Sequence, residues 1–108
     1  MNAFSEHLAS ELKITFSKEA QEKMNSSGIQ VGDATLVEIG RVVTLDDDIR
    51  KRRNTLILTA GPAFVVAVRK REVKTIYTLE DMKKGIMLFF DSISINLSVG
   101  GPEDGKDE

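Results

Sequence analysis

Between residues 41 and 79, this 108-residue chain carries four short runs rich in Val, Ile, Leu and Thr. The runs are residues 41–45, 55–60, 63–69 and 73–79, and each has the length of a strand rather than of a helix. The connections between them are too short for parallel crossovers, which need a dozen or more residues, and they favour antiparallel neighbours. We therefore predict a four-stranded antiparallel meander.

The first forty residues have helical patterning. Apolar residues recur every four positions over residues 3–12, which predicts a first helix. Ser17 is a suitable N-cap for a second helix, which Gly28 would end. Asp33 would begin a third, short helix that ends at Gly40. We expect these helices to pack on one face of the meander.

The C-terminal part is less regular. Thr78-Leu-Glu-Asp81 resembles a capping box and predicts a last helix to about residue 91. Residues 93–99 alternate between apolar and polar side chains, as in an extended segment. The two middle runs are apolar on both faces, so the face away from the helices needs cover from this C-terminal part or from a partner subunit.

These elements predict one α+β domain. It spans residues 1–99, with N-terminal helices on a four-stranded antiparallel meander and a C-terminal helix or extended segment. Residues 100–108 form an acidic tail with no apolar side chain to bury, and we expect this tail to be disordered.

Charge is distributed unevenly along the chain. Fifteen Lys and Arg against 17 Asp and Glu give a net charge of −2, which excludes a globally basic nucleic-acid binder but not a local basic patch. In a meander, the connections at residues 46–53 and 69–71 fall at the same end of the sheet. The candidate partner- or phosphate-binding residues are Arg50, Lys51, Arg52, Arg53, Arg69, Lys70, Arg71 and Lys74.

Three interpretations of these basic turns stay open. They could contact the phosphates of a nucleic acid, or an acidic protein surface. They could also be solvated turns without a ligand, partly neutralised by Asp46, Asp47 and Asp48. The turns have no interleaved aromatic residues, which disfavours stacking with single-stranded bases.

Several kinds of chemistry lack the residues they need. The chain has no cysteine and one histidine, which excludes disulfides, thiolate zinc sites, cysteine nucleophiles and multi-histidine metal centres. We expect His7 at the surface of the first helix, and we predict no metal and no cofactor. The sequence has no run of 18 apolar residues and no signal-peptide pattern. We therefore expect no membrane association and a cytoplasmic location.

The stretch from Ile14 to Ile29 resembles the opening of a family of small uncharacterised domains related to the RelE-, ParE- and BrnT-type toxins of toxin–antitoxin modules. The family's opening is a short strand followed by Ser-x-His-Ala-x-x-Arg-Met-x-x-Arg-Gly-Ile. The matching residues here are Ser17, Ala20, Met24, Gly28 and Ile29. Residues 73–78 are similar to the family's last strand, so the resemblance covers about residues 13–80. It implies helices followed by a meander, and a ribonuclease activity.

This chain departs from the family pattern at three positions. Glu19 stands in place of the histidine, Lys23 in place of the first arginine and Ser27 in place of the second. In RelE-like ribonucleases, basic side chains hold the scissile phosphate, and a glutamate would repel it. If these positions carry the family's chemistry, the resemblance implies a weakened or inactive copy.

We therefore expect a non-catalytic binding or regulatory module on a toxin-like scaffold, which contacts nucleic acid or an acidic protein through the basic turns. Small size and slight acidity would also suit an inhibitor carried by a mobile element. The alternative is an endoribonuclease toxin that uses arginines of the two turns. A third hypothesis is a structural or dimerising domain without a ligand. A homodimer would use the exposed sheet face or the last helix.

Overall fold

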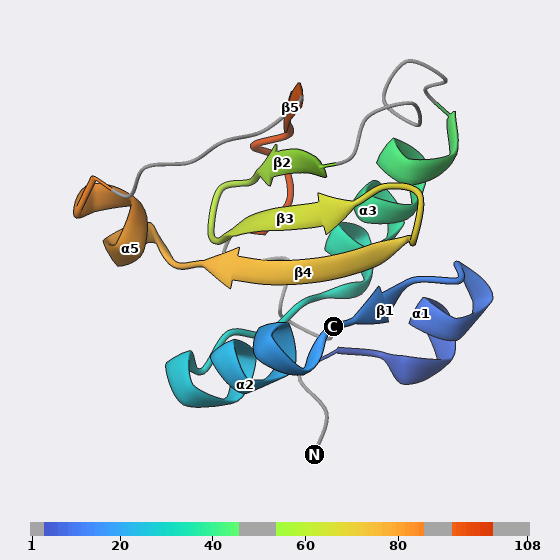
Figure 1. Ribbon diagram of the computed structural model, residues 1–108, viewed down its shortest axis with the longest axis horizontal. Helices are drawn as coiled ribbons and strands as arrows, with labels where there is room; N and C mark the ends of the chain where they lie inside the picture. Colours follow the sequence, from blue (N-terminus) through green and yellow to red (C-terminus); the bar gives the residue numbers. More distant parts are fainter. Residues whose placement is uncertain (1–3, 46–53, 86–91, 101–108) are drawn as a thin grey trace.

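A computed structural model describes residues 4–45, 54–85 and 92–100 of the chain. These residues form an α+β domain in which the three N-terminal helices cover one face of a mixed sheet (Figure 1). In chain order the elements are α1 (Glu6–Glu11), β1 (Thr15–Phe16), α2 (Lys18–Ser27), α3 (Asp33–Leu45), β2 (Asn54–Leu58), β3 (Ala63–Ala67), β4 (Glu72–Tyr77), α5 (Leu79–Lys83) and β5 (Ser92–Ile95).

Over the described residues the sheet has five strands, in the order β1-β4-β3-β2-β5. Strands β2, β3 and β4 form an antiparallel meander, as the sequence predicts for residues 55–79. The prediction of a four-stranded, purely antiparallel sheet is wrong, because β1 joins β4 and β5 joins β2 in parallel at the two edges. These edge strands come from the two ends of the described chain, and short-range sequence patterns do not reveal such distant pairings.

The predicted strand over residues 41–45 is the last part of α3 instead. Its valines, Val42 and Val43, are buried in the main core together with Leu36 and Ile39, and this spacing is that of one helix face. The burial of this apolar face outweighs the weak β preference of valine. The third helix also does not end at Gly40. That glycine lies inside α3, where an added Cβ would be 3.4 Å from the Leu12 side chain, so it allows close packing.

The predicted ends of α2 are confirmed. The Ser17 hydroxyl accepts a hydrogen bond from the amide of Ala20 at 3.0 Å, as an N-cap does. Gly28 has the left-handed φ of 67°, and the amide of Ile29 donates to the carbonyl of Met24. These local interactions fix where α2 begins and where the chain leaves it.

The predicted last helix has its capping box but not its predicted length. Thr78 and Asp81 exchange side-chain and backbone hydrogen bonds at the start of α5. The helix ends at Lys83, and Gly85 follows with a φ of 78°. The rest of the predicted helix, residues 86–91, and the acidic tail from residue 101 lie outside the described residues.

The main core lies between the helices and one face of the sheet. Side chains of α1, α2 and α3 pack there against Ile57, Phe64, Val66, Val73 and Ile76, all of which are fully buried. On the opposite face a smaller cluster gathers around Leu56, Ala63 and Val65, with the partly buried Leu58, Tyr77 and Met82 at its border. The expectation that both faces of the middle strands need cover is therefore confirmed.

The segment after β5 is held against the turn between β2 and β3. The amide of Asn96 donates to the carbonyl of Leu58 at 2.9 Å, and the amide of Ala60 donates to the carbonyl of Val99 at 2.8 Å. Gly100 lies so close to this turn that an added Cβ would be 2.2 Å from the Thr59 hydroxyl. The described chain therefore ends beside the sheet, packed against the β2–β3 connection.

Candidate functional site

The structure describes four of the eight predicted binding residues. Arg69, Lys70 and Arg71 lie in the connection between β3 and β4, which we call the basic turn, and Lys74 lies within β4. Arg69, Lys70 and Lys74 are exposed to solvent. The remaining four, Arg50 to Arg53, lie outside the described residues.

Lys74 stands at an irregularity of the sheet. Val66 is opposite Val73 while Val65 is opposite Thr75, so Lys74 is the extra residue of a β-bulge. Its carbonyl accepts a hydrogen bond of 2.6 Å from the Ser17 hydroxyl, which also caps α2. The backbone of Lys74 therefore holds the start of α2, and its side chain stays exposed.

Arg71 differs from its neighbours because its side chain is already engaged. One terminal nitrogen of the guanidinium donates to the carbonyl of Leu12 at 2.6 Å, and Nε donates to the carbonyl of Lys13 at 3.2 Å. The carbonyl of Arg71 in turn accepts from the amide of Thr15 at 3.0 Å. These bonds fasten the end of α1 and the start of β1 to the basic turn, so Arg71 is a structural residue.

The backbone around this contact is unusual. Arg71 has a φ of 51° and Lys13 a φ of 58°, values that non-glycine residues adopt rarely. Lys13 is exposed and adds a positively charged residue next to the basic turn. The sequence patterns did not single out Lys13, because α1 and the basic turn lie almost 60 residues apart and no local signal links them.

The start of β2 lies at the same end of the sheet as the basic turn. Asn54, the first residue of β2, is opposite Ala67, the last residue of β3, and the basic turn begins two residues after Ala67. Arg53 precedes Asn54 directly in the sequence. The helix α5 follows the other end of β4 (Figure 1).

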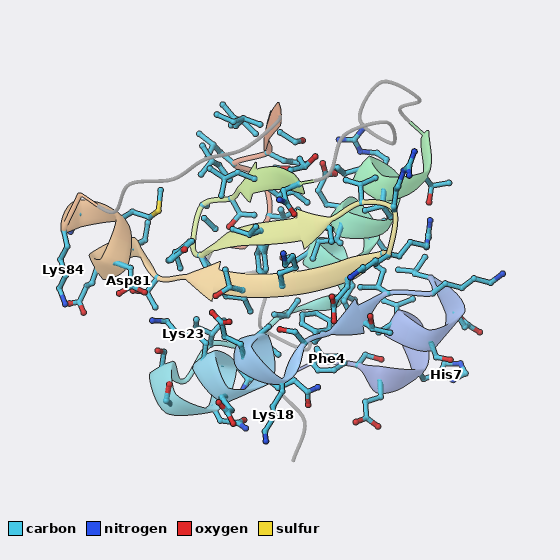
Figure 2. The ribbon with its side chains drawn as sticks, viewed as in Figure 1. Phe4, His7, Lys18, Lys23, Asp81 and Lys84 are labelled. Atoms are coloured by element: carbon cyan, nitrogen blue, oxygen red, sulfur yellow. The ribbon has the colours of Figure 1, made fainter. Side chains whose placement is uncertain are left out.

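A second group of polar residues lies at that other end. Lys23 of α2 and Asp81 of α5 point toward one another (Figure 2), with Nζ 2.7 Å from Oδ2. The hydrogen bond from Lys23, followed by the one from the Thr78 amide, lowers the pKa of Asp81 to about 2. The pair borders a groove of about 480 Å³ that Ser27 and Pro62 also line.

The family resemblance placed three exchanged residues on α2. Lys23, which stands at an arginine position of the family pattern, is bound to Asp81, and Ser27 lines the same groove. Glu19 is exposed on the same helix. Lys23 therefore already holds a carboxylate, and binding of a phosphate there would have to compete with that ion pair.

The described residues also contain a buried carboxylate that the sequence patterns did not indicate. Glu38 on α3 is 6% exposed, and the Nε of Arg41 donates to it at 3.1 Å. The bond from Arg41 lowers the pKa of Glu38, and a hydrogen bond from Asn96 acts in the same direction, although burial opposes both. This cluster joins α3 to the segment after β5.

The other predicted features concern histidine, metal and membrane. His7 is exposed on α1, as predicted, with its ring 3.3 Å from the carboxylate of Glu11. Within the described ranges, no three His, Cys, Asp or Glu side chains come together as metal ligands would. None of the helices in those ranges has the length and apolarity needed to span a bilayer.

Comparisons of the chain with protein-family models, with curated proteins and with solved structures gave no match. The resemblance to the RelE-, ParE- and BrnT-type toxins therefore stays a prediction that rests on the residues quoted for it.

Proposed function

We propose that this chain is a non-catalytic module that binds the phosphate backbone of a nucleic acid through its basic turn and through Arg50–Arg53, the run directly before β2 in the sequence. The observation that carries the proposal is that the residues of the basic turn have two different roles. Arg71 fastens the turn to α1, while Arg69 and Lys70 stay exposed. A fixed turn with exposed cations is a suitable phosphate contact, because little conformational entropy is lost on binding.

The position of β2 supports including Arg50–Arg53 in the same surface. Asn54 lies opposite Ala67 at the end of the sheet that carries the basic turn, and Arg53 is its neighbour in the sequence. Together with the exposed Lys13, these residues would give one end of the sheet a positive charge on a chain whose net charge is −2. Such polarity orients the protein toward a polyanion.

The ribonuclease alternative receives less support from the described residues. Arg71, one of the arginines that it would use, is bonded to the carbonyls of Leu12 and Lys13. Lys23, at a family motif position, is paired with Asp81. Both side chains are held by these partners, so binding of a scissile phosphate would have to compete with the bonds that they already make.

Fluorescence anisotropy with labelled duplex DNA and labelled RNA tests the proposal across a salt series. We expect binding that weakens with salt, with log K linear in log salt concentration. If labelled polyglutamate bound in the same titration and neither nucleic acid did, the result would indicate an acidic protein partner and would contradict the proposal. Absence of any binding at low salt would contradict it as well. Cleavage of the RNA during the titration would favour the ribonuclease alternative.

A further inference from the structure

We propose that β5 pairs with β5 of a second copy of this chain, so that two five-stranded sheets join edge to edge about a two-fold axis at Ser94. The inference is independent of the proposed nucleic-acid binding. It rests on the edge position of β5, on its exposed apolar side chains and on the direction of its backbone groups.

The two edges of the sheet are protected differently. At one edge, β1 has two residues, and the carbonyl of Phe16 accepts a hydrogen bond of 2.9 Å from the side chain of Gln21. At the other edge, β5 is the last strand of the sheet that the described residues form, and residues 92–99 contain neither a charged residue nor a proline. Edge strands usually carry such residues because they prevent pairing with another chain.

Three of the five large apolar residues exposed in the described ranges gather at this edge. Ile93 is 58% exposed, Ile95 is 64% exposed and Leu97 is 67% exposed. Ile93 pairs with Leu56 and Ile95 with Leu58, so both isoleucines lie on the sheet face that carries the smaller core cluster. That cluster therefore continues to the edge of the sheet and ends there in exposed side chains.

The hydrogen bonds of β5 determine which backbone groups face outward. The amide of Asn96 donates to the carbonyl of Leu58, so Asn96, and by strand alternation Ser94, direct their backbone groups toward β2. The backbone groups of Ile93 and Ile95 then point away from β2. They form the row of donors and acceptors that another strand would meet.

Only one antiparallel register pairs the outward backbone groups and also places both Ile93 and Ile95 opposite isoleucines of the partner. With an antiparallel partner, Ile93 would lie opposite Ile95 of the partner subunit and exchange two N–H···O bonds with it, and the two-fold axis repeats this pair. Ser94 would lie opposite its own copy on the axis. A shift by one residue would place isoleucine against serine on the wrong face.

A second copy fits this edge better than a charged partner. The segment from Ser92 to Val99 carries no charge, so two chains of net charge −2 can meet here without like charges in contact. A charged peptide would gain no ion pair from these side chains. The apolar face of each sheet would continue across the junction onto the isoleucines of the other copy.

A single-cysteine variant tests the axis, because the natural chain has no cysteine. In the proposed register, the Cα atoms of the two copies of residue 94 would be about 4.5 Å apart, within the range of about 4.4 to 6.8 Å that a disulfide requires. Ser94→Cys should therefore form a covalent dimer on mild oxidation. Val37→Cys, at an exposed position of α3, is the matched control and should not. Equal cross-linking of both variants, or of neither, would overturn the proposal.

Sedimentation equilibrium tests the register. The natural chain should form a dimer, and I93K/I95K should raise the dissociation constant at least ~10-fold, because like charges would face each other. I93K/I95E should restore dimerisation, since the introduced lysine of each copy would face the introduced glutamate of the other. The proposal would be overturned if the natural chain stayed monomeric, or if I93K/I95K left the dissociation constant of the dimer unchanged. The cysteine test still decides the proposal if a lysine variant fails to fold, because Ser94→Cys leaves Ile93 and Ile95 unchanged.

Discussion

The guanidinium of Arg71 donates a 2.6 Å hydrogen bond to the backbone carbonyl of Leu12, which precedes it by 59 residues in the sequence. Leu12 and Lys13 follow directly after α1, so their carbonyls lack partners within that helix. Arg71, almost 60 residues later in the sequence, supplies two of the missing donors. The sequence predicts Arg71 as part of a charged binding surface. In the structure, Arg71 is instead a clamp that holds the end of α1 to the sheet.

This clamp predicts different effects for two neighbouring arginines. Arg71→Ala should lower the free energy of unfolding by about 1–3 kcal/mol, because the charge-assisted bonds to Leu12 and Lys13 are lost. Arg69→Ala should change it by less than about 0.5 kcal/mol, because that side chain is exposed. Chemical denaturation of both variants provides the measurement. Equal effects of the two substitutions would show that Arg71 does not act as a clamp.

The buried carboxylate of Glu38 gives a second stability prediction. Glu38→Ala should destabilise the fold by about 1–3 kcal/mol, because Arg41 and Asn96 both lose their acceptor. Glu38→Gln should cost less, since an amide oxygen can still accept from Asn96. A double-mutant cycle with Asn96→Ala, followed by chemical denaturation, measures the coupling. Additive effects of the two substitutions would contradict a shared hydrogen bond.

The ion pair between Lys23 and Asp81 predicts a pH dependence of stability. The pKa of Asp81 in the folded protein, about 2, lies below its ordinary value of 3.8, so the ionised carboxylate stabilises the folded state. This stabilisation is fully present above the ordinary pKa and is lost as the pH falls from there through about 2. Asp81→Asn should therefore be destabilising at pH 7, and its difference from the natural chain should shrink at low pH.

Denaturation curves at neutral pH and at pH values down to about 2 measure this difference. Glu80→Gln, at the neighbouring exposed position of α5, is the control for a general loss of negative charge. If the difference between Asp81→Asn and the natural chain were the same at every pH, the ion pair would not contribute to stability.

The close approach of Gly100 to the β2–β3 turn predicts a strong dependence on residue size. Gly100 has a φ of 83°, and an added Cβ would be 2.6 Å from Cβ of Thr59. Gly100→Ala should destabilise the fold by about 1–3 kcal/mol, through backbone strain and displacement of the segment around Gly100 from the turn. Gly28→Ala is a matched control, because Gly28 also has a positive φ but its added Cβ meets no atom within 4 Å.

Gly28→Ala should lower the free energy of unfolding by about 0.5–1 kcal/mol, because only the unfavourable backbone conformation contributes there. Thermal or chemical denaturation compares the two alanine variants. A loss of stability at Gly100 no larger than the loss at Gly28 would show that Gly100 is not packed against the turn.

Features that depend on neighbouring residues were predictable from the sequence. The cap of α2 at Ser17, its stop at Gly28 and the capping box at Thr78 each involve residues within five positions. The three strands of the meander follow from runs of β-branched residues with short connections. In each case the pattern and the structure depend on the same local interaction.

Features that depend on distant partners were not predictable. Residues 41–45 form helix because Val42 and Val43 continue the buried face of α3, although valine itself favours strands. Gly40 was predicted to end the third helix, but it lies inside α3, where its small size lets the side chain of Leu12 pack against the helix. The strands β1 and β5, and the clamp by Arg71, all require contacts between opposite parts of the chain.

In the proposed function, exposed cations of the basic turn bind nucleic acid while Arg71 holds the turn in place. The most direct test compares R69A/K70A with K83A/K84A, which removes two exposed lysines at the other end of β4 and changes the net charge equally. Anisotropy titrations of labelled duplex DNA over a salt series measure both affinity and salt dependence. We predict that R69A/K70A weakens binding and lowers the salt slope by about two, while K83A/K84A leaves both nearly unchanged. Equal weakening by the two double variants would show that binding depends only on net charge and would contradict a specific role of the basic turn.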